Sequence, residues 1–426
     1  MSQFPGNIYP IHPSLPEING LKAYPSIALV SGEVDLAIIA IRTALVPTAL
    51  NECIQKEVKG VILVAAGFKE MEDKAGAELQ DKLAAMANAA KIKIIGPNTF
   101  GVVNLQSGLN ASFTPEFSFT PKGNIGLVSQ SGGFCHLMVP LAMAEHVGLS
   151  KVIGLGNRCN VDFADVLDYL GDDPDTKVIM MYIEGTDDAR RLFEVASRVS
   201  MEKPIVALKA GRFQARDEAA YSHTGSMAGE PEIYRAAFQQ AGIIVTESST
   251  ELLDAAKVLA LCPLPRSNRV ATLSEQAGPG IVARDICEEN GLVLARFSDE
   301  TIEQVEALLP PLAGIKSNPV DMNVWNDGYT VGGVMEVVLK DDNIDGMVLF
   351  AAYTPAISAL PRKIAGLLKS PKKPVISCFP SPPGVWVEEK HDFEESGVAF
   401  FPTPERAAKA MVALVKRSQL VNQSRL

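Results

Sequence analysis

The chain alternates short apolar runs rich in β-branched residues with longer helical stretches from one end to the other. A strand buried on both faces of a parallel sheet reads as a continuous apolar run, and each parallel strand needs a crossover, usually a helix, before the next strand. The alternation therefore predicts parallel sheets covered by helices, which is the doubly wound α/β class. We expect strands at Asn7–Ile11, Leu36–Ile41, Val61–Ala65, Ile92–Ile95, Asn124–Val128, Lys151–Leu155, Val178–Glu184, Ile205–Lys209, Arg269–Leu273, Asp345–Ala351 and Pro374–Phe379.

The expected elements form three successive blocks, which we interpret as domains over residues 1–121, 122–262 and 268–426. Prolines within Cys262–Asn268 disfavour a continuing helix, so this segment is expected to link the last two domains. The final segment, Ser418–Leu426, is polar and is expected to be a linker too. The clearest helices are expected at Val46–Lys56, Ala75–Ala90, Glu251–Leu261 and Pro404–Arg417.

Composition and charge narrow the functional classes. The 50 acidic and 39 basic residues give a net charge of −11, spread without a long like-charge block, which disfavours nucleic-acid binding. Apolar stretches such as Val348–Ala352 are much shorter than the roughly 20 residues that cross a bilayer, and the N-terminus does not resemble a signal peptide. We therefore expect a soluble, cytoplasmic protein with no membrane segment. The six cysteines form no Cys-x-x-Cys pair, so neither disulfides nor a metal site is expected.

Two turns between a strand and a helix share one design. The segments Ile125–Gly133 and Val270–Gly280 each give an apolar strand, a serine, a run of small residues and then a helix. Any doubly wound fold needs tight turns of this kind simply to connect its elements. The free N–H groups and the positive dipole end of a helix also bind anions, so two such turns can hold one anion from opposite sides. We interpret the pair as a phosphate clamp.

The segment Ala219–Gly229 places His223 among small and flexible residues after the expected strand Ile205–Lys209. The chain has only five histidines, and a lone loop histidine usually does no more than cap a turn. Beside phosphate-binding turns, however, an imidazole can carry a phosphoryl group on a ring nitrogen. The two turns upstream and downstream favour this second interpretation.

Several short motifs follow one another in a recognisable order. They are Ile95–Asn98 with Gly101, Val128–Gly133, Gly156–Asn157 with Val161–Asp162 and Asp165, Asp172–Glu184, Lys209–Arg212, Ser222–Gly225 and Asn318–Asp321. Together they resemble the nucleoside-diphosphate-forming acyl-CoA synthetases, a superfamily that includes the ADP-forming acetyl-CoA synthetases and, more distantly, succinyl-CoA synthetase. The resemblance covers nearly the whole chain and rests on the order and spacing of these motifs taken together.

The resemblance implies a fold and a reaction. The fold is a Rossmann-like CoA-binding domain followed by two flavodoxin-like domains in series. The reaction converts acyl-CoA, ADP and phosphate into a carboxylic acid, CoA and ATP, reversibly, through an acyl phosphate and a phosphohistidine. The resemblance thus implies that the turn in Ile125–Gly133 binds phosphate and that the first domain binds CoA.

The resemblance also implies roles for particular residues. His223 would accept the phosphoryl group, and Glu184, at the carboxyl end of its strand, would orient the ring. By their chemistry alone, Lys209 and Arg212 would either neutralise phosphate or face solvent. The residues expected to bind phosphate through their N–H groups are Ser131, Gly132, Gly133, Gly278 and Gly280, and those expected to contact CoA are Gly67, Phe68 and Asn98.

Two parts of the family pattern are missing from the sequence. Relatives begin with a strand and a Gly-rich turn that binds the CoA nucleotide, whereas this chain starts at Phe4–Pro13, which resembles their second strand, so we expect a truncated chain. The ATP-grasp module that holds ATP or ADP with Mg²⁺ is also absent. It would come from a β subunit or a missing C-terminal domain. The expected partners are therefore CoA, a small carboxylic acid and this module, in an oligomer.

Two other interpretations remain from the sequence. The chain would be a catalytically silent, CoA-binding regulatory subunit if the missing first unit reflects lost function. A nicotinamide-dependent dehydrogenase is disfavoured, because no Gly-x-Gly-x-x-Gly turn is followed about 20 residues later by an acidic residue.

Overall fold

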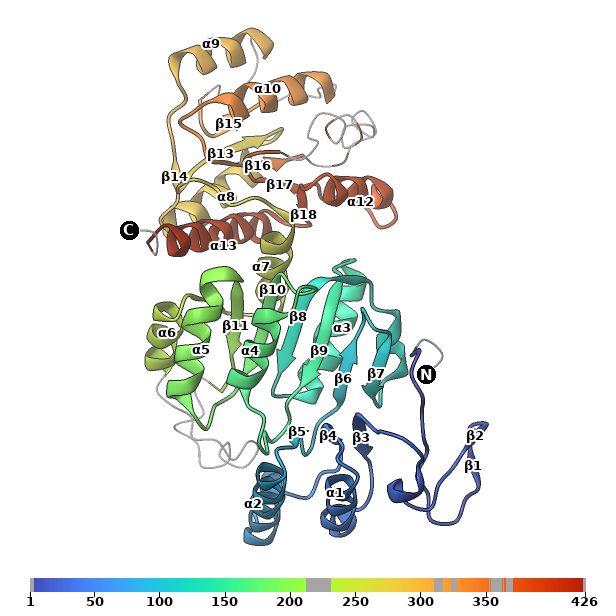
Figure 1. The fold of residues 1–426 in the computed structure, drawn as a ribbon. Coiled ribbons are helices and arrows are strands. Elements are labelled where there is room, and N and C mark those ends of the chain that lie inside the picture. The colour runs from blue at the N-terminus through green and yellow to red at the C-terminus, as the bar shows by residue number, and fades with distance from the viewer. Residues whose placement is uncertain are drawn as a thin grey trace. The chain divides into compact units, whose positions relative to one another are not determined.

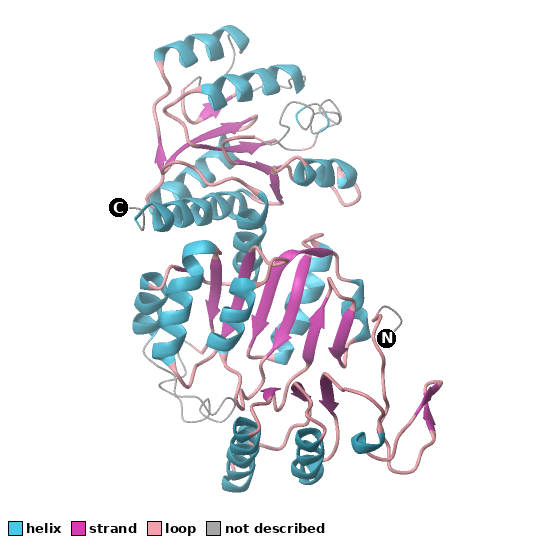
Figure 2. Ribbon diagram, viewed as in Figure 1, coloured by secondary structure: helices cyan, strands magenta, loops and turns pink. Residues whose placement is uncertain are grey.

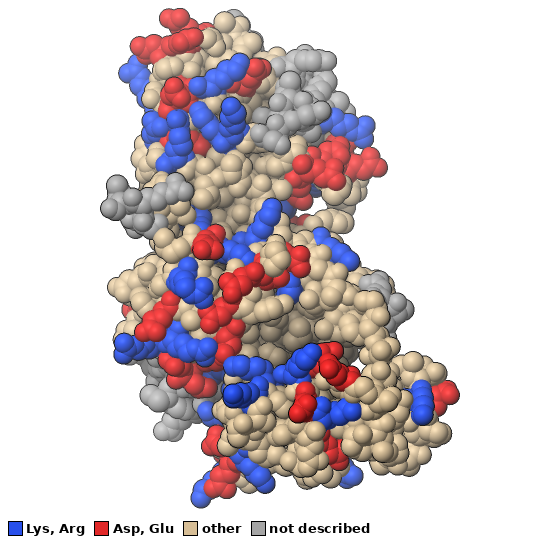
Figure 3. All heavy atoms as spheres, viewed as in Figure 1, with Lys and Arg blue, Asp and Glu red and all other residues tan. Residues whose placement is uncertain are grey.

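The computed structural model describes residues 4–211, 231–309, 317–322, 328–351, 353, 362, 364 and 371–423. It divides into two compact units, Met1–Ser249 and Thr250–Leu426, each built from mainly parallel strands and helices (Figures 1 and 2). The fold is therefore α/β, as the alternating pattern predicts. Acidic and basic side chains are interspersed on the face that Figure 3 shows. Within the described part of the chain, no helix is both long enough and apolar enough to cross a membrane.

The smaller of the two mainly parallel sheets of the first unit has the order β3-β4-β5. Its elements are β3 (Leu36–Ile39), η2 (Thr43–Leu45), α1 (Val46–Gln55), β4 (Gly60–Leu63), η3 (Lys69–Met71), α2 (Lys74–Ala89) and β5 (Lys93–Ile95). Helix α1 buries Val46, Leu50 and Cys53, which recur on one helical face. They pack with Val61 of β4 and Leu83 of α2 in a single core.

The strand expected at Asn7–Ile11 is wrong. Of these residues only Ile11 makes a β-bridge, to Tyr24. The first paired strands are β1 (Glu17–Ile18) and β2 (Leu21–Lys22), followed by η1 (Ile27–Leu29). Prolines interrupt this part of the sequence, and each removes the N–H group that a strand ladder needs, so apolar side chains alone did not produce a strand.

The second sheet of this unit has the order β12-β11-β10-β8-β9-β6-β7. Its strands are β6 (Gly101–Asn104), β7 (Leu109–Ser112), β8 (Lys122–Ser129), β9 (Leu149–Gly154), β10 (Val178–Ile183), β11 (Ile205–Lys209) and β12 (Ile243–Thr246), with η4 (Pro115–Phe119) after β7. Strands β8 to β12 are parallel, as predicted. The antiparallel pair β6 and β7 extends this sheet through β9 and was not predicted from the sequence.

Helices lie on both faces of the second sheet (Figure 1). They are α3 (Gly132–Ala144), α4 (Phe163–Asp172), α5 (Ala189–Glu202) and α6 (Pro231–Gln240). Side chains alternate between the faces of a strand. On β10, Ile179, Met181 and Ile183 join the core formed with α4 and α5, whereas Tyr182 packs against Phe134 of α3 on the other face.

The second unit has a parallel sheet in the order β14-β13-β16-β17-β18, with β15 paired to β13. Its strands are β13 (Arg269–Ser274), β14 (Val293–Leu294), β15 (Val320–Asp321), β16 (Gly346–Phe350), β17 (Val375–Cys378) and β18 (Ala399–Phe401). Its helices are α7 (Ser249–Leu261), α8 (Ala277–Glu289), α9 (Asp299–Leu308), α10 (Gly328–Lys340), α12 (Val387–Glu395) and α13 (Pro404–Gln423). The segment between α7 and β13 is a loop, as expected.

The linker expected from Ser418 onward is wrong for residues 418–423, which continue α13. Ser418 is buried, and its Oγ donates a hydrogen bond to the Pro265 carbonyl (2.6 Å). The helix also buries Met411 and Leu414 upstream. The polar sequence is therefore helical here, and the buried side chain of its serine has a hydrogen-bond acceptor.

Candidate functional site

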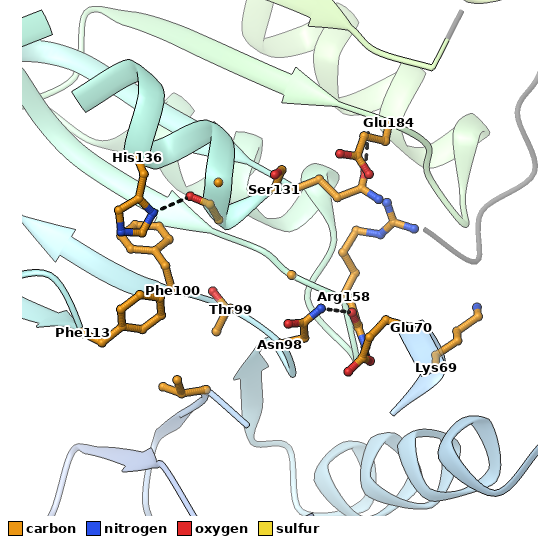
Figure 4. A pocket seen from close by; sticks show the side chains of 16 residues that line it. Lys69, Glu70, Asn98, Thr99, Phe100, Phe113, Ser131, His136, Arg158 and Glu184 are labelled. Atoms are coloured by element: carbon orange, nitrogen blue, oxygen red, sulfur yellow. Dashed lines mark hydrogen bonds between the residues drawn. The ribbon is translucent and has the colours of Figure 1, made fainter. Parts of the chain in front are cut away.

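The strand order of the second sheet reverses at β8, since the chain passes from β8 to β9 on one side and then to β10 on the other. Ligands of doubly wound sheets bind at such a point, beyond the carboxyl ends of the strands. A pocket of about 400 Å³ lies there, between these strand ends and the turns that follow β4 and β5 (Figure 4). It is lined by Val64, Lys69, Glu70, Asn98, Thr99, Phe100, Phe113, Gln130, Ser131, Gly132, Gly133, His136, Gly156, Asn157, Arg158 and Glu184.

Helix α3 begins at this pocket. Its N-cap residue, Ser131, accepts a hydrogen bond from the Phe134 N–H group (3.3 Å). A Cβ atom added to Gly132 or Gly133 would meet no other part of the protein closer than 3.5 Å, so protein packing does not require glycine at either position. The missing side chains leave open space beside the first N–H groups of a helix, which have no partner within the helix. This geometry suits an anion.

Glu184 follows β10 and lines the same pocket. Its N–H group donates to Gln130 Oε1 (3.1 Å), and its carbonyl oxygen accepts a hydrogen bond from Lys209 Nζ (2.8 Å). Its carboxylate Oε1 accepts one from the Tyr182 hydroxyl (3.1 Å). Main chain and side chain are thus both held in place. Lys209 is buried, so the solvent-facing alternative for this residue is wrong, whereas Arg212 lies outside the described residues.

The turns after β4 and β5 supply the third side of the pocket. Asn98, expected to contact CoA, lines it, and its Nδ2 donates to Asn157 Oδ1 (3.3 Å). The N–H groups of Gly67 and Phe68 donate to the carboxylate of Glu70, at 2.5 Å for Gly67. Phe68 is fully buried, and neither residue lines the pocket. The contact of Gly67 and Phe68 with CoA stays a prediction.

Glu70 joins the two parts of the first unit. Besides the Gly67 and Phe68 N–H groups, its carboxylate accepts a hydrogen bond from Asn157 Nδ2, which also reaches Gln80 Oε1 (3.0 Å). Burial alone would raise the pKa of Glu70, but these hydrogen bonds outweigh it and lower the pKa. The carboxylate therefore stays ionised where the first sheet meets the loop after β9.

Aromatic rings form one wall of the pocket, where Phe100, Phe113 and His136 lie on the side opposite Glu184 and Arg158 (Figure 4). His136 Nδ1 lies 2.8 Å from the Gly132 carbonyl oxygen, so it must carry a proton, because a carbonyl only accepts. Its Nε2 lies 2.7 Å from Thr114 Oγ1. The Phe113 ring stacks on the imidazole at 5.6 Å. Both ring nitrogens are therefore engaged within the protein.

Sequence reasoning missed Arg158, His136 and Glu70 as residues of the pocket. Arg158 is buried and donates hydrogen bonds to the Gly185 carbonyl and to Asp187. Its neighbours Gly156 and Asn157 belong to a motif of the sequence, and that motif could have pointed to the loop. Nothing comparable marks His136, which lies inside an apolar helical sequence and reads as a core residue.

The remaining predicted site residues are His223, Gly278 and Gly280. His223 is outside the described residues. Gly278 and Gly280 lie in the second unit, in the first turn of α8, where a Cβ atom on Gly278 would meet nothing within 4 Å. The likeness of the two turns extends to their hydrogen bonds, since Ser274 Oγ donates to the Gln276 carbonyl as Ser129 Oγ does to that of Ser131. That both turns hold one phosphate stays a prediction.

The described residues contain no group of three or more His, Cys, Asp or Glu side chains arranged to hold a metal ion. The described lining of the pocket offers the main-chain N–H groups of the turn at Ser131–Gly133, side-chain amides, the cationic side chains of Lys69 and Arg158, and the carboxyl groups of Glu70 and Glu184. The N–H donors and the cationic side chains suit an anionic group, and the amides and carboxyl groups can orient a polar one.

Two known domain families match most of the first unit. A family described as "CoA binding domain" matches residues 1–104, and a family described as "Succinyl-CoA ligase like flavodoxin domain" matches residues 122–259. The pocket thus lies where the two matched regions meet, with Asn98 from one and Ser131 and Glu184 from the other.

Whole proteins of high similarity extend the likeness to the full chain. The alpha subunit of the ADP-forming acetate–CoA ligase II of Pyrococcus furiosus is 38% identical over 98% of this chain and 91% of its own length. The ADP-forming acetate–CoA ligase I of Archaeoglobus fulgidus is 36% identical over the whole of this chain, which spans 61% of that longer protein. The acetyl-coenzyme A synthetase 1 of Ca. Korarchaeum cryptofilum, solved with phosphate and ADP, superimposes with a TM-score of 0.91 at 32% identity, over 99% of this chain and 91% of that one.

Proposed function

Because this chain belongs to the ADP-forming acyl-CoA synthetases, we propose that its pocket binds the thioester end of an acyl-CoA and that phosphate attacks the acyl group there. The chain is the alpha-type component of an acid–CoA ligase, and the enzyme names of its relatives do not favour a silent regulatory subunit. The net reaction is acyl-CoA, ADP and phosphate giving carboxylic acid, CoA and ATP. One observation carries the proposal: the open N-terminus of α3 and the fixed carboxylate of Glu184 share a pocket that borders the CoA-binding domain.

In the first step a phosphate oxygen forms a bond to the acyl carbon, and the bond to the CoA sulfur breaks with the thiolate leaving. Charge on the phosphate would be stabilised by the N–H groups of Ser131, Gly132 and Gly133, where the missing Cβ atoms allow close approach. Gly278 and Gly280 would supply the same kind of donors from the second turn. Asn98, which lines the pocket, would contact the pantetheine arm. Gly67 and Phe68 would contact CoA from the turn between β4 and η3.

In the second step the His223 imidazole attacks phosphorus, and the carboxylate of the acid leaves. Glu184 would accept a hydrogen bond from the other ring nitrogen and so fix the orientation of the ring. The phosphoryl group then passes to ADP, which together with Mg²⁺ would be bound by an ATP-grasp subunit or domain. This route makes the chain one half of an oligomeric enzyme.

The proposal is tested by incubating the chain with its ATP-grasp partner and ATP labelled in the γ-phosphate. We expect a label that is stable in base and labile in acid, as a phosphohistidine is, and that disappears in the His223→Ala variant. His391→Ala removes an exposed histidine from α12 and serves as the control, which should label like the wild type. A wild-type chain that stays unlabelled with a competent partner would contradict the proposal.

A further inference from the structure

Tyr182 is a polar residue on a strand whose other members are all buried, from Val178 to Met181 and at Ile183. It lies two residues before Glu184, and side chains two residues apart in an extended chain point to the same side. Its hydroxyl donates to Glu184 Oε1 at 3.1 Å. The phenol therefore meets the carboxylate that the proposed function uses, on the face of the sheet that carries α3.

The ring of Tyr182 is held from α3. It stacks on the Phe134 ring with the centroids 3.9 Å apart and the planes inclined by 19°. Phe134 belongs to the first turn of α3, where its N–H group donates to the Ser131 side chain. The aromatic stack thus connects the carboxylate of Glu184 to the turn that we propose binds phosphate. A phenylalanine would stack equally well, so what the tyrosine adds is its O–H group.

The Tyr182 hydroxyl keeps its proton at neutral pH and so remains a hydrogen-bond donor. Burial, followed by the negative charge of Glu184, raises the pKa of Tyr182 well above its usual value. Gln130 and Lys209 already fix the main chain of Glu184 through its N–H group and carbonyl oxygen. With Oε1 engaged by Tyr182, the remaining oxygen, Oε2, has no hydrogen-bond partner among the described residues.

We propose that Tyr182 is a positioning residue that fixes Oε1 of Glu184 and so presents Oε2 to the imidazole that accepts the phosphoryl group. This inference rests on the proposed function, because it assigns Glu184 the task of orienting that ring. The glutamate side chain has several rotatable bonds. When Tyr182 holds Oε1, the carboxylate is already ordered before the reaction, so less conformational entropy is lost in the reaction step. The stack on Phe134 holds the tyrosine itself in place.

The first test is Tyr182→Phe in the complex with the ATP-grasp partner. This substitution keeps the stack on Phe134 and removes only the O–H group. Because a hydrogen bond to a charged group is lost, we expect the single-turnover rate of histidine phosphorylation to fall about tenfold or more. The KM values for CoA, ADP and phosphate should stay unchanged, as should the melting temperature. Tyr169→Phe, on the surface of α4, is the matched control and should phosphorylate like the wild type.

A double-mutant cycle separates positioning from a general structural role. Glu184→Asp keeps a carboxylate but withdraws it from the Tyr182 hydroxyl, so in this background Tyr182→Phe should lower the rate less than twofold. An equal loss in both backgrounds would overturn the inference. So would a Tyr182→Phe variant that phosphorylates within twofold of the wild type, or one whose loss appears in KM instead.

The same experiment distinguishes this inference from the proposed function. A wild-type chain that carries no phosphohistidine would overturn the proposed function and this inference with it. A labelled wild type with an unimpaired Tyr182→Phe variant would overturn the positioning role alone and leave the phosphohistidine route intact.

Discussion

Gln130 and Glu275 occupy the same place in the two similar turns, each directly after the serine that ends a strand. Their main-chain N–H groups donate to corresponding carbonyls, those of Tyr182 and Phe350. The Gln130 side chain accepts two main-chain N–H groups, whereas Glu275 Oε1 is buried without a partner among the described residues. Burial raises the pKa of Glu275 to about 7. The second turn therefore has an ionisable group at a position where its charge is costly, whereas the first turn has a neutral amide there.

Replacing Glu275 with Gln should stabilise the chain at high pH only. Unfolding returns the carboxyl to a pKa near 4.5, so the folded state favours the protonated form, and stability falls as the pH rises from 4.5 to about 7. We expect Glu275→Gln to raise the free energy of unfolding by up to about 3 kcal/mol at pH 8 and by almost nothing near pH 4.5. Urea denaturation at both pH values measures this. An equal gain at both pH values would contradict the raised pKa of Glu275. In the control Gln130→Glu, two main-chain N–H groups can donate to the new carboxylate, so stability should not fall with pH in this way.

At the scale of elements, turns after parallel strands carry glycines for two different reasons. Gly96 is required by packing, because its φ is +102° and an added Cβ would lie 2.3 Å from the Leu63 carbonyl oxygen. Gly133 in the first turn of α3 has neither constraint, since the nearest atom to an added Cβ is Ser131 Oγ at 3.7 Å. The first glycine therefore serves the fold, and the second leaves room at the helix terminus.

The two glycines should respond differently to alanine. Gly133→Ala adds a better helix former without a clash, so we expect unchanged or slightly higher thermal stability together with a loss of acyl phosphate formation and a raised KM for phosphate. Gly96→Ala should lower the free energy of unfolding by about 2 kcal/mol or more. Thermal melts and an assay of acyl phosphate as its hydroxamate distinguish the two effects. A Gly133→Ala variant with normal phosphate KM would argue against anion binding at this turn.

Elements follow from the sequence where their signal is local. The buried parallel strands β8, β10 and β11 begin and end within three residues of the expected positions, because a continuous apolar run is visible in the sequence itself. The hairpin of β6 and β7 gave no such signal. Its strands bury only alternate residues or fewer, and they form because β6 pairs with the edge of β9 and β7 then pairs with β6.

At the scale of the whole molecule, the chain combines a CoA-binding domain with a flavodoxin-like domain, and a relative of similar length is named an alpha subunit. We proposed that the nucleotide half of the reaction is supplied by an ATP-grasp partner. The two chemical steps then divide between the components. On this proposal, thioester cleavage by phosphate would need only groups of this chain, whereas ATP formation would need the partner.

The isolated chain, given an acyl-CoA and phosphate, should therefore release CoA and form acyl phosphate but no ATP. Free thiol and hydroxamate measure the first step, and luciferase measures ATP. Adding ADP and the partner should produce ATP, and the His223→Ala variant should still form acyl phosphate while failing to make ATP. ATP formed by the isolated chain, or no thioester cleavage without the partner, would contradict this division of the reaction.

The sequence by itself determined the α/β class, most of the buried strands and the turns that carry Asn98, Ser131 and Glu184, because apolar runs and the small residues after them are local features. Only the tertiary structure decided which turns share a pocket and what completes it. Arg158, His136 and Glu70 enter that pocket through contacts between residues distant in the sequence, such as Glu70 with Asn157. Such contacts depend on how the two sheets of the first unit pack, and no local pattern specifies that packing.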